Sequence, residues 1–275
     1  MGLTVRMKEH LRWFLEDDLG KGDVTSALLP LQKATASIQI KQDCVLAGLE
    51  ELAYLFSLKQ CKVKFLAKDG QAVLKGKIVA HITGINRNIL GVERTALNVL
   101  SRMSGVATAC AQARKIAGKS KVQLALTRKT LPGFNLFDKK AAVLAGVWPH
   151  RINLSSAILL KDNHLKFFPN VLEAVLQAKR KNKQKKVEVE VETLEEAADA
   201  VLGGADIVML DNFSPEKARN AVVLIRKLSA QTRIELSGGI NLNNLKKYSK
   251  LGADILSMGS LTHSLKGIDC SLEIE

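Results

Sequence analysis

The chain between residues 122 and 257 alternates between two hydrophobic periods. Short apolar runs rich in β-branched residues predict buried strands, and apolar positions three or four residues apart predict helices. Helices and strands follow each other every 20 to 35 residues or so, an order typical of a parallel sheet with crossover helices. The predicted strands are Val122–Thr127, Ala157–Leu160, Val187–Val191, Asp206–Leu210, Arg233–Leu236 and Asp254–Ser257. The predicted helices are Leu136–Gly146, Val171–Arg180, Leu194–Leu202, Pro215–Leu228 and Leu242–Lys250.

Two of these units resemble each other in sequence. Gly204–Leu210 and Gly252–Met258 each place a helix-ending glycine before a buried strand. Six such units predict an α/β barrel of the TIM type, open or incomplete, with a doubly wound open sheet as the alternative. No GxGxxG motif follows a strand, which argues against a dinucleotide-binding domain.

The first hundred residues have a different pattern. Helical spacing near Leu11 precedes strand-like alternation at Thr35–Ile40 and Cys61–Ala67, which predicts a small α+β domain. A long helical pattern then runs from Leu90 to Ala117. We place the domain boundary in this helix. The expected domains are an N-terminal domain of residues 1–105 and a catalytic barrel of residues 106–263, with the tail 264–275 a candidate to pack on the first.

The formal charge of +14, from 41 basic and 27 acidic residues, permits two interpretations. A basic protein can bind nucleic acid, or its cations can line a site for acidic small molecules. Eight Phe, two Trp and two Tyr provide few platforms for stacking bases, which disfavours nucleic acid. The densest basic run, residues 179–186, is expected to be a solvated loop.

Cysteine usage and hydropathy indicate a cytoplasmic protein. The four cysteines are scattered, without a CxxC pair, as is usual in a reducing compartment. Residues 1–16 lack the apolar segment of a signal peptide, and no apolar run is long enough to cross a bilayer, so we expect no membrane partner.

Polar residues follow the C-terminal ends of all six predicted strands, where parallel barrels build active sites. The early strands contribute cations: Arg128, Lys129 and Lys161, with His150 and Arg151 on a loop between them. Cations without acidic partners repel one another, so an anionic ligand is the expected compensation.

The later strands contribute carboxylates and glycines. Glu188, Glu190 and Glu192 share one strand face, which we expect to point into the barrel mouth or to solvent because burying unpaired charges is costly. With Asp211, these carboxylates suit Mg²⁺ or ribose hydroxyls.

Glycine-rich segments after the last two strands, at Ser237–Gly239 and Gly259–Ser260, predict a phosphate site. Glycine allows backbone N–H groups to approach an anion closely, and phosphate sites in such barrels often use these loops.

Several motifs together, in this order and spacing, resemble the quinolinate phosphoribosyltransferase family, also called nicotinate-nucleotide pyrophosphorylase (carboxylating). The resemblance covers nearly the whole chain. The segments that carry it are Gly22–Thr25, Glu93–Asn98, Ser104–Thr108, Thr127–Gly133, His150–Arg151, Lys161–His164, Glu188–Glu192, Leu210–Asn212 and Ser237–Gly239.

The resemblance implies an enzyme, a pentosyltransferase (glycosyltransferase) of NAD biosynthesis. It would convert quinolinate and phosphoribosyl pyrophosphate to nicotinate mononucleotide, CO₂ and pyrophosphate, with Mg²⁺. It also implies an N-terminal α/β sandwich, an open α/β barrel, and a homodimer or an assembly of dimers whose active sites the partner subunits complete.

The same resemblance implies a role for each matched residue. Quinolinate carboxylates would be bound by Arg128, His150, Arg151 and Lys161, with Arg94 contributed by the partner subunit. Lys129 would contact the reacting substrates, and Glu190 and Asp211 would bind ribose and Mg²⁺-pyrophosphate. The phosphate loop would comprise Ser237, Gly238, Gly239 and Gly259, with His263 near the phosphate.

One segment departs from the family pattern. The family has a glycine-rich run before its His-Arg pair, whereas this chain has Val147-Trp148-Pro149 before His150. Without the glycines the backbone has less conformational freedom, and Val147 and Trp148 add bulk near the pocket, which can change the loop geometry and the choice of substrate. A related enzyme for another pyridine or aromatic acid is therefore an alternative, and a basic nucleic-acid-binding protein is a remote one.

Overall fold

The computed structural model describes residues 2–275 and divides into two compact units. Unit 1 comprises the residues up to Ala111, the segment Leu131–Gly146 and the tail Leu265–Glu275. Unit 2 comprises Gln112–Thr130 and Val147–Ser264. The division falls within one long helix, α3 (Asn86–Ala117), six residues after the boundary drawn from the sequence.

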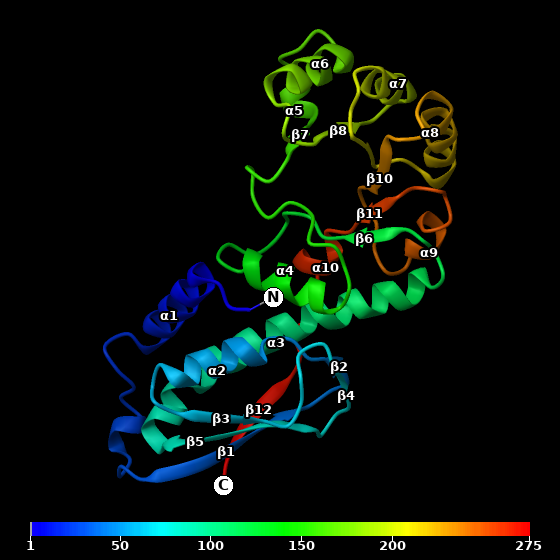
Figure 1. Cartoon of the computed structure of the whole chain (residues 1–275). Coiled ribbons are helices and arrows are strands. Elements are labelled where there is room, and N and C mark those ends of the chain that lie inside the picture. Colours follow the sequence, from blue (N-terminus) through cyan, green and yellow to red (C-terminus); the bar gives the residue numbers. More distant parts are fainter. Residues whose placement is uncertain (1) are drawn as a thin grey trace. The chain divides into compact units, whose positions relative to one another are not determined.

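Unit 1 is built on an antiparallel sheet in the order β12-β1-β5-β3 (Figure 1). Its central strands bury Ile38 and Ile82 completely, as their alternating pattern requires. The tail joins this sheet through β12, which pairs with β1 from Ala36 to Ile40. The strands are β1 (Lys33–Ile40), β3 (Lys62–Phe65), β5 (Ile78–Ile85) and β12 (Cys270–Ile274), with a separate pair of β2 (Cys44–Val45) and β4 (Ala72–Val73).

The helices of unit 1 bury one apolar face each. α1 buries Met7, Leu11 and Leu15, at the spacing of one helix face. Among residues 2–275, no helix is both long and apolar enough to cross a membrane, although α3 has 32 residues. The helices are α1 (Val5–Leu19), the 3₁₀ turn η1 (Ser26–Leu28), α2 (Leu49–Ser57), the first part of α3 and α4 (Asn135–Leu144).

Unit 2 contains the parallel sheet that the sequence predicts. Its strand order is β6-β11-β10-β9-β8-β7, and α6, α7 and α8 lie along the outer side of the strands (Figure 1). The strands are β6 (Gln123–Ala125), β7 (Ile158–Leu160), β8 (Val187–Val191), β9 (Ile207–Asp211), β10 (Arg233–Ser237) and β11 (Ile255–Ser257). The helices are α5 (Asp162–Leu165), α6 (Val171–Lys181), α7 (Leu194–Leu202), α8 (Pro215–Leu228), α9 (Leu245–Tyr248) and α10 (Ser260–His263).

The strand order identifies this sheet as an open barrel. Strands β7 to β11 lie side by side in chain order, and the first strand, β6, pairs with the last, β11. A doubly wound sheet would instead reverse its order at a switch point, so that alternative is wrong. β6 and β7 do not pair, and the free side of β6 takes a single bridge, from Ala125 to Trp148.

Helix α4 differs from its predicted place. Its pattern follows β6 in the chain, and we expected it to be the first barrel helix, but it belongs to unit 1. Two ion pairs within that unit hold it: Asp138 with Arg102 at 2.8 Å, and Lys140 with Glu51 at 2.8 Å. Asp138 and Glu51 are fully buried. Buried charges require partners, and α4 finds them on α2 and α3.

Loss of one partner of a buried ion pair should destabilise unit 1 strongly. Asp138 binds Arg102 through both carboxylate oxygens, at 3.0 and 2.8 Å. We predict that Asp138→Ala lowers the free energy of unfolding by about 3 kcal/mol, because the partly buried Arg102 charge loses the Asp138 carboxylate. Urea unfolding followed by circular dichroism measures this. Lys179→Ala, which removes a half-exposed pair with Asp206, is the control and should cost less than about 1 kcal/mol. Equal losses would contradict the account of α4.

Candidate active site

The C-terminal ends of the parallel strands surround one cavity of about 410 Å³ in unit 2. This is the end at which the sequence predicted a functional rim. Ten of the predicted site residues line the cavity: Arg128, Lys129, His150, Arg151, Lys161, Glu190, Asp211, Ser237, Gly238 and Gly239.

Three predicted residues do not line the cavity. Gly259 and His263 lie beside it, since a side-chain carbon on Gly259 would come within 3.1 Å of the His263 ring and 3.3 Å of Lys129 Cδ. The Thr262 hydroxyl donates to the Lys129 carbonyl at 2.7 Å, which ties this turn to the end of β6. Arg94 is exposed on the part of α3 that belongs to unit 1, and its relation to this cavity stays a prediction.

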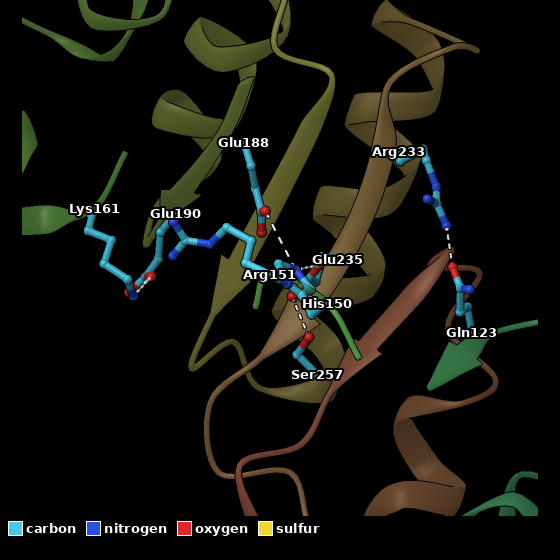
Figure 2. Close-up of polar contacts among 9 residues, drawn as sticks. All are labelled: Gln123, His150, Arg151, Lys161, Glu188, Glu190, Arg233, Glu235 and Ser257. Carbon is cyan, nitrogen blue, oxygen red and sulfur yellow. Dashed lines mark hydrogen bonds and ion pairs between the residues drawn. The ribbon is translucent and has the colours of Figure 1, made fainter. Parts of the chain in front are cut away.

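Lys161 and Glu190 form an ion pair across the ends of β7 and β8 (Figure 2). We expected the rim cations to lack acidic partners, and for Lys161 this is wrong. The Glu190 side chain is 15% exposed and that of Lys161 is 43% exposed, so both groups still face the cavity. The pair places a cation and a carboxylate within reach of one ligand.

Arg128, Lys129 and Arg151 differ from Lys161, because no carboxylate of residues 2–275 forms an ion pair with them. Burial lowers the pKa of Arg151, Glu188 opposes this, and the positive charge of Arg128 adds to the lowering. Figure 2 shows the Arg151 side chain pointing toward Glu190. Three cations without protein partners at one cavity favour an anionic ligand there.

His150 has both ring nitrogens occupied inside the protein. Its Nε2 lies 3.2 Å from a Glu235 oxygen and 3.6 Å from a Glu188 oxygen (Figure 2). Its Nδ1 accepts a hydrogen bond from the Arg151 backbone N–H at 2.7 Å. The residue adopts a left-handed backbone, φ 55°, which is uncommon outside glycine and asparagine.

Opposing influences act on the ionisation of this ring. Burial lowers the pKa of His150, but hydrogen bonds to Glu188 and Glu235 outweigh it and raise the pKa to about 9. The Arg151 N–H, however, points at Nδ1 from 2.7 Å and leaves no room for a hydrogen on that atom. The raised pKa alone would make the ring a cation at neutral pH, but the contact at Nδ1 excludes the second hydrogen, so we interpret the ring as the neutral form, with its proton on Nε2 and donated to Glu235.

Glu188 and Glu235 are the main differences from the sequence analysis. We expected the Glu188–Glu192 face to lie at the barrel mouth or in solvent, but Glu188 is only 2% exposed, because His150 reaches it as a partner. Glu235 was not predicted at all. It is fully buried and accepts a hydrogen bond from the Ser257 hydroxyl at 2.5 Å. Its signal was the alternation of β10, which puts Glu235 on the same face as Ser237.

The segment Val147-Trp148-Pro149 lies beneath His150, Glu188 and Glu235, and Trp148 forms a bridge to Ala125 of β6. The Trp148 ring packs on the buried residues Ala125, Ile207 and Ile255, and its centroid lies 4.6 Å from that of His150. The Arg233 guanidinium lies over the Trp148 ring, 5.9 Å from its centroid. Trp148 therefore supports His150 from below.

Two groups of residues could hold a metal ion. Glu190 and Asp211 offer oxygen ligands on neighbouring strands, the donor type that Mg²⁺ prefers. Burial raises the pKa of Asp211, and the charge of Glu190 raises it further, so a cation there would relieve repulsion. His150, Glu188 and Glu235 also lie close enough together, within 4.8 Å, but their ligand atoms already interact with one another.

Two family models match the chain in succession. The N-terminal domain of quinolinate phosphoribosyl transferase matches residues 23–104, and the C-terminal domain of the same family matches residues 106–273.

Individual relatives match over almost their whole length. A probable carboxylating nicotinate-nucleotide pyrophosphorylase of Archaeoglobus fulgidus is 40% identical, over 92% of this chain and 98% of the relative. The human nicotinate-nucleotide pyrophosphorylase [carboxylating] is 35% identical, over 95% of this chain and 89% of the relative. The solved structure of the nicotinate-nucleotide pyrophosphorylase from Francisella tularensis superposes with a TM-score of 0.93 at 34% sequence identity, over 98% of this chain and 96% of that chain. The chain belongs to the quinolinate phosphoribosyl transferase family.

Proposed function

We propose that the protein catalyses the reaction of quinolinate with phosphoribosyl pyrophosphate to give nicotinate mononucleotide, CO₂ and pyrophosphate. The observation that carries the proposal is the set of side chains that line the cavity at the strand ends of unit 2. Unpaired arginines, two carboxylates and a glycine-rich turn line one cavity, and the two substrates need these three kinds of group. Family membership and the names of the relatives support the same reaction.

The dicarboxylate is assigned to the cationic side of the cavity. Arg128 and Arg151 present planar guanidinium groups, which can each bind a carboxylate through two hydrogen bonds. Lys161 adds a third positive charge, held in place by Glu190. Lys129 lies on the same strand end as Arg128, between this region and the Gly259 turn, where it can contact both substrates.

The phosphate is assigned to the glycine-rich turn after β10. Gly238 has φ 86° and Gly239 has φ 61°, conformations that expose backbone N–H groups. Gly238 also packs directly on Asn212, so that a side chain there would overlap Asn212 atoms. We propose that Gly259 and His263, next to Lys129, extend this phosphate site.

Glu190 and Asp211 would hold Mg²⁺, mostly through bound phosphoribosyl pyrophosphate, and the ion would neutralise the departing pyrophosphate. The same two carboxylates stabilise the positive charge that develops on the anomeric carbon of ribose as its bond to the leaving oxygen breaks. Arg128, Arg151 and Lys161 hold quinolinate so that its ring nitrogen attacks this carbon. The resulting pyridinium accepts the electron pair of the adjacent carbon–carboxylate bond as CO₂ leaves, and a proton from solvent replaces it on the ring.

We also propose a homodimer, or an assembly of dimers, in which Arg94 of each chain completes the partner's site. Arg94 is exposed on the part of α3 that belongs to unit 1, so its side chain is accessible to a second chain. A cytoplasmic location is proposed as well, and it is supported by the four free cysteines.

Loss of Arg128 should weaken quinolinate binding selectively. We predict that Arg128→Ala raises the KM for quinolinate about 10- to 100-fold, the effect of a charged hydrogen-bonding pair, and changes the KM for phosphoribosyl pyrophosphate little. Steady-state assays of nicotinate mononucleotide formation with Mg²⁺ measure both constants, and Lys179→Ala is the control. Turnover of nicotinate in place of quinolinate by the unmodified protein would refute the assigned substrate.

A side chain in the glycine-rich turn should damage the phosphate site. Gly238→Ala would displace Asn212, and we expect the affinity for phosphoribosyl pyrophosphate, whose phosphate the turn would bind, to fall at least about tenfold. Gly204→Ala is the matched control, since Gly204 has a similar φ of 81° but open space around it and lies outside the cavity. Isothermal titration calorimetry measures the affinity of each variant. If the two variants bind phosphoribosyl pyrophosphate equally well, the turn does not hold the phosphate.

Mixing two inactive variants tests the shared site. In a heterodimer of Arg94→Ala and Arg128→Ala chains, one of the two sites would contain both arginines. Random reassortment after mild dissociation should therefore restore about a quarter of the unmodified activity. Each variant alone, treated identically, is the control. Activity that stays at the level of the separate variants would place Arg94 in its own chain's site or outside any site.

A further inference from the structure

The His150 ring has no nitrogen left for a ligand, although it lines the cavity. Nε2 faces the two buried carboxylates, and Nδ1 faces the Arg151 amide. The side chain is only 8% exposed. A direct hydrogen bond from the ring to a substrate carboxylate would require one of these contacts to break.

Packing prevents the ring from turning to free a nitrogen. Trp148 lies against it at 4.6 Å with a tilt of 44°, and Trp148 itself is fixed on the barrel floor by apolar contacts. On the other side, Glu235 accepts from the Ser257 hydroxyl and is fully buried, so its carboxylate has a single orientation. Glu188 is buried beside it.

The hydrogen bonds form a continuous chain from the barrel interior to the rim. Ser257 donates to Glu235, His150 donates to Glu235, and the Arg151 amide donates to His150. The hydrogen bond from the Arg151 amide to His150 Nδ1 joins two adjacent residues, and the first of them, His150, has the left-handed backbone conformation. Such a conformation costs about 1 kcal/mol or more and persists only where surrounding contacts fix it.

We propose that Glu235 is a positioning residue, which orients His150 so that His150 fixes the Arg151 backbone and aims its guanidinium at a substrate carboxylate. His150 then acts through Arg151 and makes no hydrogen bond to the substrate from its ring. The proposal rests on the proposed function for the identity of that substrate, quinolinate. It assigns a role to Glu235 and Ser257 and gives His150 a different role from the direct binding that the family resemblance implies.

A first experiment is independent of the reaction. The protein has five histidines, so nitrogen-15 labelling of histidine gives few ring signals, and His150→Gln identifies those of His150. At neutral pH without substrate, we expect Nδ1 of His150 to be unprotonated and Nε2 to carry the proton. In Glu235→Ala this fixed tautomer should become a mixture. A protonated Nδ1 in the unmodified protein, or an unchanged tautomer in Glu235→Ala, would overturn the proposal.

A second experiment separates positioning from general structural damage. We expect Glu235→Ala to raise the KM for quinolinate about tenfold and to leave the KM for phosphoribosyl pyrophosphate within about twofold. Glu235→Gln should restore most of the loss, because glutamine can accept from His150 and donate to Ser257. In an Arg151→Ala background, Glu235→Ala should have no further effect on quinolinate. Effects of Glu235→Ala and Arg151→Ala that multiply would show that Glu235 does not act through Arg151.

Ser257→Ala covers the case in which Glu235→Ala does not fold. It removes only the hydroxyl that orients Glu235, and we expect a two- to fivefold rise in the KM for quinolinate that again disappears in Arg151→Ala. An equal rise in both backgrounds would contradict the proposal. If unmodified protein does not use quinolinate, the proposed function fails, and the nitrogen-15 spectra alone then decide the role of Glu235.

Discussion

Arg128, Lys129 and Arg151 bring three positive charges to one rim, and within residues 2–275 no carboxylate forms an ion pair with them. Mutual repulsion of these cations opposes folding, so their gathering needs compensation from a ligand. The neighbouring Lys161 is balanced by Glu190, and the neutral His150 ring donates its one hydrogen to Glu235. The cavity therefore retains positive charge on the side assigned to quinolinate and carboxylates on the side assigned to ribose and Mg²⁺.

Two carboxylates, Glu188 and Glu235, are buried beneath the rim, and their contacts with His150 position the rim residue next to it in the chain, Arg151. Glu235 accepts hydrogen bonds from His150 and Ser257, and burial raises the pKa of Glu188, which makes its neutral form easier to reach. The His150 ring in turn needs a rigid support, which Trp148 provides. Substrate binding at Arg151 is thus linked to packing at the opposite end of the barrel.

The sequence predicts the regular part of the fold well. The bounds of β8, α7 and α8 agree with the prediction to the residue, since Thr193 with Glu196 and Ser214 with Pro215 mark where the two helices begin. The rim residues were also predicted, because strand ends in a parallel sheet converge. Helix α4 was misplaced because its ion-pair partners lie far away in sequence. Glu235 was missed because its hydrogen-bond partner, His150, lies 85 residues away in the sequence, so the strand pattern alone does not mark this glutamate as part of the site.

A crystal structure with quinolinate bound tests the central claim most directly. We predict that both carboxylates lie against Arg128, Arg151 and Lys161, with the ring nitrogen directed toward Glu190 and Asp211. His150 Nε2 should remain on Glu235, with Arg151 still bonded to Nδ1. Quinolinate bound away from these cations, or a His150 ring turned out to donate to it, would contradict the account.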